Sequence, residues 1–231
     1  MAELWDGLRE AIRLVIEGDA TIREVALRTI LVSGSATVLS LLVGVPLGYV
    51  LARGQFPGRN LALSMVNTGM GMPPVVVGLV VWLMLVRSGP FGGLELIYTR
   101  RAMVIAQFII ALPLVAGFTA ASIQALPREL PDLLATLGAG RVRTLWLLVR
   151  EAHLGLLAAV MAGFGAVVSE VGASMAVGGN IKGETRVLTT AIVTETSRGE
   201  TASAIALGLI LLAMAFSVNL ALTVVQQRRR T

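Results

Sequence analysis

The stretch PDLLATLGAGRVRTLWLLVREAH, residues 131–153, lies between two long apolar runs and differs from both of them. It mixes leucines and a tryptophan with three arginines, and two glycines interrupt it. If the flanking runs lie in lipid, this stretch cannot be exposed to lipid, because charged side chains are costly there. It is also too apolar for a free loop. A groove on another protein would meet both requirements.

The composition places the chain among membrane proteins. Of its 231 residues, 55% are hydrophobic and only 14% are charged, whereas soluble domains carry about 25% charged residues. The mean hydropathy is +0.81. The net charge of +5 comes almost wholly from arginine, which in a membrane protein anchors spans more often than it binds nucleic acid. There is no cysteine, and the single histidine, His153, belongs to no group of metal ligands. We expect no metal site, no catalytic residue and no nucleic-acid partner.

Five apolar runs are long enough to cross a bilayer, whose roughly 30 Å core takes about 20 helical residues. They predict an all-α integral membrane protein, because an open sheet edge is not tolerated in lipid. We expect one transmembrane domain over residues 1–231. The predicted spans are residues 29–52, 61–86, 102–126, 153–177 and 202–226, with a loop at 128–152.

The segment before the first span, LWDGLREAIRLVIEG (4–18), predicts an amphipathic helix. It would lie in the membrane interface or, equally, pack on the outer surface of the protein. Its apolar residues at helical spacing are Leu4, Leu8, Ile12, Val15 and Ile16.

The distribution of arginines does not orient the chain. With residues 127–153 in the cytoplasm, the two sides would carry nearly equal numbers of basic residues, so the positive-inside rule does not decide. The triple arginine at 228–230 favours a cytoplasmic C-terminus.

Residues 132–149 indicate two short helices with a break at Gly138-Ala139-Gly140. Glycine costs about 1 kcal/mol inside a helix, so the break predicts a turn or a close backbone approach. Its mixed apolar and basic character fits a groove on a partner protein. An ordinary re-entrant or interfacial connection is the alternative.

The segment LLATLGAGRVRTLW (133–146) resembles the cytoplasmic loop of ABC importer permeases, whose pattern is Glu-Ala-Ala, three residues, Gly-Ala and an apolar helix. Here an aspartate stands at the glutamate position and two leucines stand at the alanines. The resemblance implies a type I importer permease fold in which this loop is a coupling helix that docks on an ATPase subunit. The residues carried over to that role are Asp132, Leu133, Leu134, Leu137, Gly138, Ala139 and Arg141.

Three further segments narrow the resemblance. NTGMGMPPVVVGL (67–79), SEVGASMAVGGNIKG (169–183) and TRVLTTAIVTETSRG (185–199) are similar to the membrane subunit of tungstate importers, which is close to molybdate and sulfate permeases. This implies a homodimer in the cytoplasmic membrane, two ATPase subunits that bind ATP and Mg²⁺, and an external oxyanion-binding protein. It also implies an N-terminus outside and a C-terminus in the cytoplasm. The chain has no Gly-Lys-Ser/Thr phosphate-binding motif, so we expect it not to be an enzyme.

The second predicted span contains two consecutive prolines, which remove two backbone donors and predict a kink or local unwinding. At membrane depth such a break is tolerated only inside protein or beside a water-filled cavity. It would line the pathway and offer freed backbone amides to an anion, or it would be a kink for helix packing. The pathway candidates are Asn67, Thr68, Gly71, Pro73 and Pro74.

Glu170 is the only acid well inside a predicted span. An unpaired carboxylate in the pore would repel an anionic cargo. We therefore expect Glu170 to be structural: paired with an arginine, hydrogen-bonded to neighbouring backbone, or protonated.

Residues 187–197 alternate hydroxyl and apolar side chains and are too short and polar to span a membrane. They predict a hairpin that dips in from the outside near residues 178–180, where related permeases place their outer gate. Lys182 and Arg186 would attract an oxyanion. An extracellular cap without contact to cargo is the alternative. The gate candidates are Ser174, Asn180, Thr189 and Thr190.

Two other classes of function fit the sequence poorly. An ion-driven secondary carrier would need ionisable relays within its spans and often has two related halves, but only Glu170 qualifies and no repeat is visible. An intramembrane hydrolase or transferase would need a nucleophile with a base, or paired acids, at membrane depth. The sequence offers neither.

Overall fold

The computed structural model describes residues 5–9, 12–13 and 20–228, and within these it contains helices and no strand. The expectation of an all-α protein is confirmed. The elements are α2 (Ala20–Arg53), α3 (Arg59–Met70), α4 (Pro74–Leu85), a 3₁₀ turn η1 (Gly92–Leu94), α5 (Arg100–Gln124), α6 (Leu130–Thr136), α7 (Arg141–Glu151), α8 (His153–Val168), α9 (Gly172–Gly178), α10 (Leu188–Ser197) and α11 (Thr201–Arg228).

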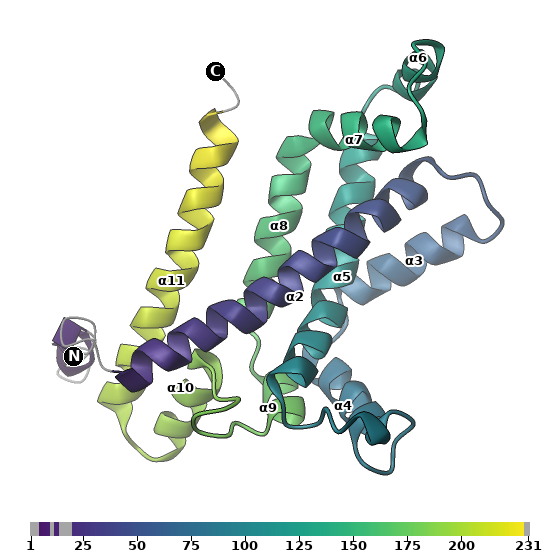
Figure 1. Ribbon diagram of the computed structural model, residues 1–231. Coiled ribbons are helices and arrows are strands. Elements are labelled where there is room, and N and C mark those ends of the chain that lie inside the picture. The colour runs from purple at the N-terminus through teal and green to yellow at the C-terminus, as the bar shows by residue number, and fades with distance from the viewer. Residues whose placement is uncertain (1–4, 10–11, 14–19, 229–231) are drawn as a thin grey trace.

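The described part of the N-terminal segment is helical over residues 5–9 and 12–13. Gly7 lies directly against Ile205 of α11, whereas Trp5 and Ile12 are exposed. Figure 1 places the segment beside the end of α11 where α10 also lies. Exposed apolar residues next to a membrane helix favour the interfacial interpretation. Three residues of the predicted pattern, Leu4, Val15 and Ile16, lie outside the described residues.

Helix α2 crosses the molecule diagonally and packs along α5 (Figure 1). Its 34 residues measure about 51 Å at about 1.5 Å per residue, which exceeds a roughly 30 Å hydrocarbon core. A tilt accommodates the excess. Gly44 and Gly48 form a small-xxx-small pair against α5. A Cβ at Gly48 would lie 2.6 Å from the carbonyl oxygen of Ala116, so this contact needs glycine.

Three helices, α2, α5 and α11, are long and apolar enough to cross a membrane, and two bent pairs bring the number to as many as five. Helices α3 and α4 meet at 105°, so the kink expected at the two prolines is confirmed. Helices α7 and α8 meet at 78°. The fourth predicted span is not continuous, because α8 ends at Val168 and α9 begins at Gly172.

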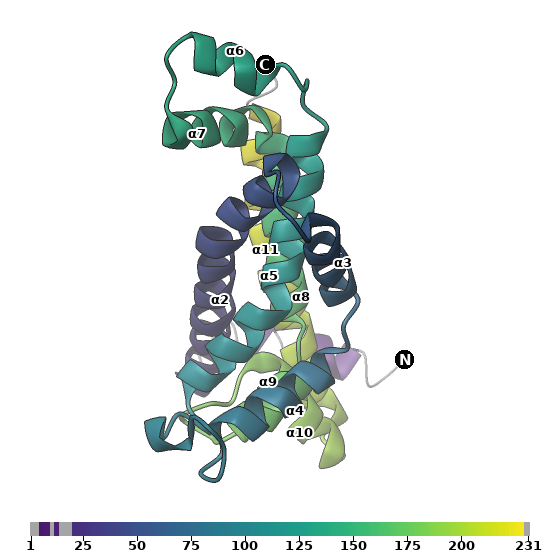
Figure 2. The ribbon, with the colours of Figure 1, turned by 90° about the vertical axis from the view of Figure 1, so that its right-hand side faces the viewer.

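The two ends of the bundle are built differently. Figures 1 and 2 show α6, α7 and the C-terminal end of α11 at one end, with α4, η1, α9 and α10 at the other. The core combines large side chains such as Met103 and Ile123 with small residues that let backbones approach closely. A Cβ at Gly78 of α4 would lie 2.5 Å from the Cα of Ala173 in α9.

Two helices remain largely uncovered. Helix α3 buries none of its residues. In the most apolar 18-residue stretch of α11, only 11% is buried. Leu61 and Met65 on α3 and Phe216 on α11 are each more than 60% exposed. In a membrane protein such faces contact lipid or another subunit.

Candidate coupling surface and transport pathway

The segment at residues 130–151 folds as two helices joined by a tight turn. Helix α6 has Pro131 and Asp132 in its first turn, where proline's fixed φ and a negative charge both favour a helix start. It ends in a Schellman motif: the amide of Ala139 donates to the carbonyl of Leu134 at 2.9 Å, and that of Gly138 to Ala135 at 3.0 Å. Gly138 has φ +80°, so this turn favours glycine.

Helices α6 and α7, with the turn that joins them, form the candidate coupling segment (residues 130–151), which lies at one end of the molecule (Figure 2). Helix α6 buries no residue. Leu137 is 75% exposed and Val142 is 82% exposed, and Leu133 and Trp146 are also more than half exposed. The guanidinium of Arg150 stacks 5.4 Å from the centroid of the Trp146 ring. Exposed apolar patches of this kind are typical of protein-binding surfaces.

Helix α7 anchors this surface to the bundle. Its buried residues are Thr144 and Leu148, and the amide of Ala152 donates to the carbonyl of Leu148 at 2.8 Å, directly before α8 begins. His153 Nδ1 lies 3.0 Å from the carbonyl oxygen of Arg150, so backbone and side chain both hold the 78° joint. The exposed face of α7 is thus joined directly to α8.

A polar stripe runs along the exposed face of α3. The exposed residues Asn60, Ser64, Asn67, Thr68 and Gly71 recur at the three- and four-residue spacing of one helix face. Polar side chains on a candidate span avoid lipid and face a cavity or a partner. Of the pathway candidates, Asn67 and Thr68 lie on this face and Gly71 follows the end of α3. Sequence reasoning missed Ser64, although its spacing from Asn67 and Thr68 was a usable signal.

The break between α3 and α4 leaves fewer free amides than the sequence suggested. The amides of Gly71 and Met72 donate to the carbonyls of Thr68 and Gly69 at 3.1 and 3.3 Å, and the two prolines have no amide hydrogen. The expectation of several freed amides is therefore wrong. The donors left free in this part of α3 are therefore side chains rather than backbone amides. Of the two prolines, Pro73 is exposed and Pro74 is partly buried at the start of α4.

Glu170 lies in the second break, between α8 and α9. Its Oε1 accepts a hydrogen bond from the amide of Ala173 at 2.7 Å, in the first turn of α9. Its carbonyl oxygen accepts one from Thr189 Oγ1 at 3.0 Å. No described basic group lies within 4.0 Å of the carboxylate. Of the arrangements expected for Glu170, the structure contains the hydrogen bond to neighbouring backbone.

The predicted gate residues are engaged in hydrogen bonds inside the protein. Ser174 and Thr190 are fully buried. Ser174 Oγ accepts from Gln107 Nε2 at 3.2 Å, and Thr190 Oγ1 donates to the carbonyl of Val187 at 3.1 Å. Asn180 accepts from Arg186 Nε and donates to Thr194 Oγ1. Residues 188–197 form a helix, α10, so the structure has a loop between two helices where a dipping hairpin was expected.

Two arginines hold the loop between α9 and α10, and sequence reasoning missed both. Arg28 of α2 is only 4% exposed and donates to the carbonyls of Arg186 and Gly183 at 2.8 and 2.7 Å. Arg100 Nε donates to the carbonyl of Glu184 at 2.8 Å. Lys182 remains exposed. A lone arginine at the start of an apolar run was the available signal for Arg28.

Apolar helices long enough to span a membrane, two of them bent pairs, and an exposed apolar segment at one end are features of membrane transport subunits. The family model described as "Binding-protein-dependent transport system inner membrane component" matches residues 44–231. The chain belongs to this family.

Individual relatives agree with the family. The chain is 38% identical to the "Tungstate uptake system permease protein TupB" of Peptoclostridium acidaminophilum, over 95% of this chain and 96% of that protein. It is 42% identical to a "Probable anion ABC transporter permease protein" of Haloferax volcanii, over 81% of this chain and 83% of that protein. A chain of the MetNI methionine ABC transporter in an inward facing conformation shares the fold, with a TM-score of 0.71 and 16% identity over 90% of this chain and 94% of that chain.

The chain is thus an inner-membrane permease subunit of an ABC importer. It is not itself the ATPase: nucleotide hydrolysis and capture of the transported molecule belong to partner subunits. Within the described residues there is no group of three or more His, Cys, Asp or Glu side chains that could hold a metal ion.

We predict that Glu170 acts through its hydrogen bond rather than its charge. Glu170→Gln keeps an oxygen acceptor for the Ala173 amide, so the thermal unfolding midpoint of the purified protein is expected to change little. Glu170→Ala removes the acceptor and is expected to destabilise by about 1 kcal/mol, as for other lost helix caps. Scanning fluorimetry in detergent measures both midpoints. Equal destabilisation by the two substitutions would show that the charge matters.

Proposed function

We propose that this permease imports an oxyanion and that the oxyanion is tungstate. The observation that carries the proposal is the similarity to a tungstate uptake permease over almost the whole of both chains. The tungstate-like segments found in the sequence include both helix breaks, at residues 71–73 and 169–171. Molybdate and sulfate are the alternatives, because all three anions are tetrahedral. The chain need not discriminate among them if an external binding protein does so.

We further propose a homodimer that docks on two ATPase subunits, each of which holds ATP and Mg²⁺. The uncovered faces of α3 and α11 leave surface for a second copy. In the dimer, each exposed coupling segment would sit in a groove on one ATPase. Because ATP favours the closed ATPase pair, its binding would draw the two coupling segments together and rock the helices between inward- and outward-open states.

The proposed orientation follows from the position of the coupling segment. Docking on an ATPase places α6 and α7 in the cytoplasm, and the C-terminal end of α11 lies at the same end of the molecule (Figure 1). The N-terminal segment, α10 and η1 would then face the outside, where a binding protein delivers the anion. With α3–α4 counted as one span, and α8 with the joint at α7 as another, the chain would cross the membrane five times.

The polar stripe on α3 is the proposed pathway lining. Ser64, Asn67 and Thr68 present hydroxyl and amide donors without a fixed positive charge, which suits weak and transient contacts with a passing anion. Ser174, Asn180, Thr189 and Thr190 are proposed to act on the outer gate by holding its closed shape, since their polar groups bond to the protein.

Replacing Asn67 with leucine tests the pathway. Asn67 is exposed and no hydrogen bond fixes it in the described structure, so Asn67→Leu is expected to preserve assembly with the ATPase. Loss of one donor to an anion is expected to slow uptake roughly tenfold, measured as tungsten accumulated by cells. Leu61→Ile serves as the control, because Leu61 is an exposed residue of the same helix that does not belong to the polar stripe. Undiminished uptake by Asn67→Leu would contradict the assignment of this face.

Gly138 tests the coupling turn. A Cβ there meets no atom within 4 Å, so Gly138→Ala is strained only through its φ of +80°. We expect weaker docking and a loss of receptor-stimulated ATPase activity. Gly140 lies two residues away with φ −70° at the N-cap of α7, where serine is preferred. Gly140→Ser is therefore the matched control and should retain stimulation. Equal behaviour of the two variants would rule out this role of the turn.

The cargo is tested by purifying the tagged chain in mild detergent with its partners and its external binding protein. Elemental analysis of the binding protein, together with ATPase assays, identifies the class and the anion. We expect a co-purifying ATPase that is stimulated by a tungsten-loaded binding protein. A binding protein loaded with molybdenum, or one without metal, would change the assigned anion but leave the assignment as an ABC importer permease unchanged. Failure to recover an ATPase would overturn the class.

A further inference from the structure

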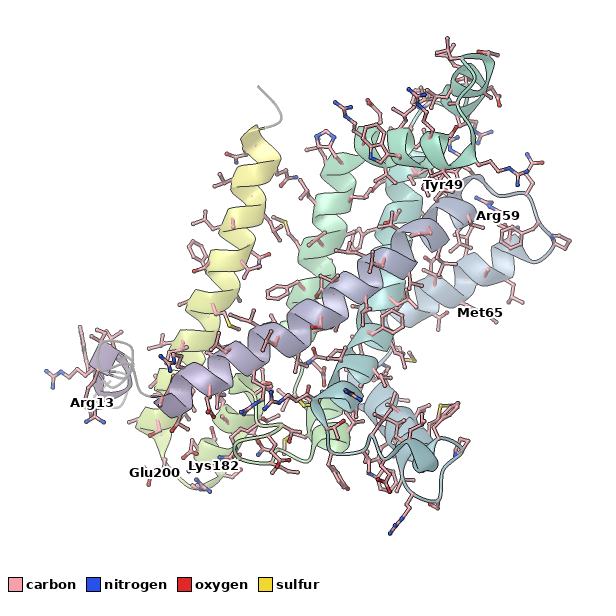
Figure 3. The ribbon with its side chains drawn as sticks, in the orientation of Figure 1. Arg13, Tyr49, Arg59, Met65, Lys182 and Glu200 are labelled. Atoms are coloured by element: carbon pink, nitrogen blue, oxygen red, sulfur yellow. The ribbon has the colours of Figure 1, made fainter. Side chains whose placement is uncertain are left out.

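A basic hollow lies at the end of the molecule that carries the coupling segment. It has a volume of about 1050 Å³ and lies between the turn after α2, the C-terminal end of α5 and the first turn of α6. Three guanidinium groups line it, those of Arg53, Arg59 and Arg128. Figure 3 shows Arg59 at this end of α2, beside the turn that leads into α3.

Helix ends hold two of these guanidiniums in place. Arg53 Nη2 donates to the carbonyls of Ile123, Leu126 and Pro127 at 3.0 to 3.2 Å. Arg59 donates from Nε and Nη2 to the last carbonyls of α2, at 2.8 and 3.2 Å. These carbonyls carry partial negative charge, which fixes the two cations without neutralising them.

No described carboxylate neutralises the three arginines. Asp132 is the only acid that lines the hollow, and neither it nor any other described acid lies within 4.0 Å of these guanidiniums. Arg53 Nε is buried and has no hydrogen-bond partner among the described atoms. Three cations around one hollow repel one another, so an anion bound there would lower the electrostatic energy.

The lining selects an oxyanion of the phosphate type. Arginine presents a planar fork of donors that matches phosphate oxygens, and Gln55, Asn60 and Gln124 add neutral polar groups. Phe56, which also lines the hollow, is 39% exposed, and Leu61 in the first turn of α3 is 62% exposed. Apolar side chains beside a basic hollow at a helix end would suit the acyl chains of an anionic lipid.

We propose that this hollow binds a phosphate-type oxyanion, either the head group of an anionic phospholipid or a free inorganic anion, and so ties the coupling segment to the turn between α2 and α3. Arg128 lies two residues before α6, whereas Arg53 and Arg59 flank the turn between α2 and α3. An anion held between these three arginines stiffens the base of α6. The cytoplasmic source of the anion rests on the orientation proposed above.

Hydrogen exchange of the purified permease–ATPase complex tests the proposal. Protection of residues 53–60 and 124–132 is followed while phosphatidylglycerol is added in mixed micelles, with equal amounts of phosphatidylcholine as the reference. A second series adds inorganic phosphate at constant ionic strength.

Arg128 is exposed and its side chain forms no hydrogen bond or ion pair in the described structure, so Arg128→Gln removes one charge without disturbing a helix end. Arg87→Gln removes an exposed charge just after the C-terminal end of α4, where it does not line the hollow. It is the matched control.

We expect an anion-dependent protection of these two segments, with a half-saturating concentration raised about tenfold by Arg128→Gln and unchanged by Arg87→Gln. Protection by phosphatidylglycerol alone identifies a lipid head group, and protection by inorganic phosphate identifies a free anion. Absence of protection by both probes, or equal weakening by the two variants, would overturn the proposal. The assay measures binding alone, so it stands or falls separately from the identity of the imported anion.

Discussion

The structure depends on the requirement that backbone polar groups within a bilayer find partners inside the protein. The two helix breaks meet this requirement together. Val75, just after the first break, lies against Gly172, just after the second, and Gly78 lets α4 approach α9 closely. Turn hydrogen bonds pair the amides that end α3, and the Glu170 carboxylate pairs one amide at the start of α9. Irregular backbone is thereby placed where α4 and α9 cross.

The same arrangement connects the two ends of the molecule through α8. The coupling segment is joined to α8 at a hydrogen-bonded bend, and α8 leads directly to the break at Glu170. From there Thr189 of α10 donates to the carbonyl of Glu170, and Arg28 of α2 donates to carbonyls of the loop between α9 and α10. We propose that a displacement imposed on α7 reaches this loop through these contacts. In this account the break at Glu170 is the position where α8 and α9 can move relative to each other.

Much of this could be read from the sequence, because apolar run length and proline position act locally. The all-α fold, the kink at Pro73-Pro74 and the turn at Gly138 follow from lipid thickness, missing amide hydrogens and glycine's freedom. The break at 169–171 could not be read this way, since no proline marks it and a crossing helix imposes it. The hydrogen bond from Thr189 to Glu170, and the partners of Arg28, could not be read either, because they join residues far apart in the chain. Ser64 could have been found from helical spacing alone.

The central claim is that residues 131–149 contact the ATPase, and site-specific cross-linking tests it most directly. The chain contains no cysteine, so Leu137→Cys and Leu212→Cys each provide one thiol, the first on the coupling surface and the second exposed on α11. A short bifunctional reagent is applied to the assembled complex. The account predicts a permease–ATPase product from position 137, with a yield that changes on ATP binding, and none from position 212. No product at 137, or equal products at both positions, would contradict it.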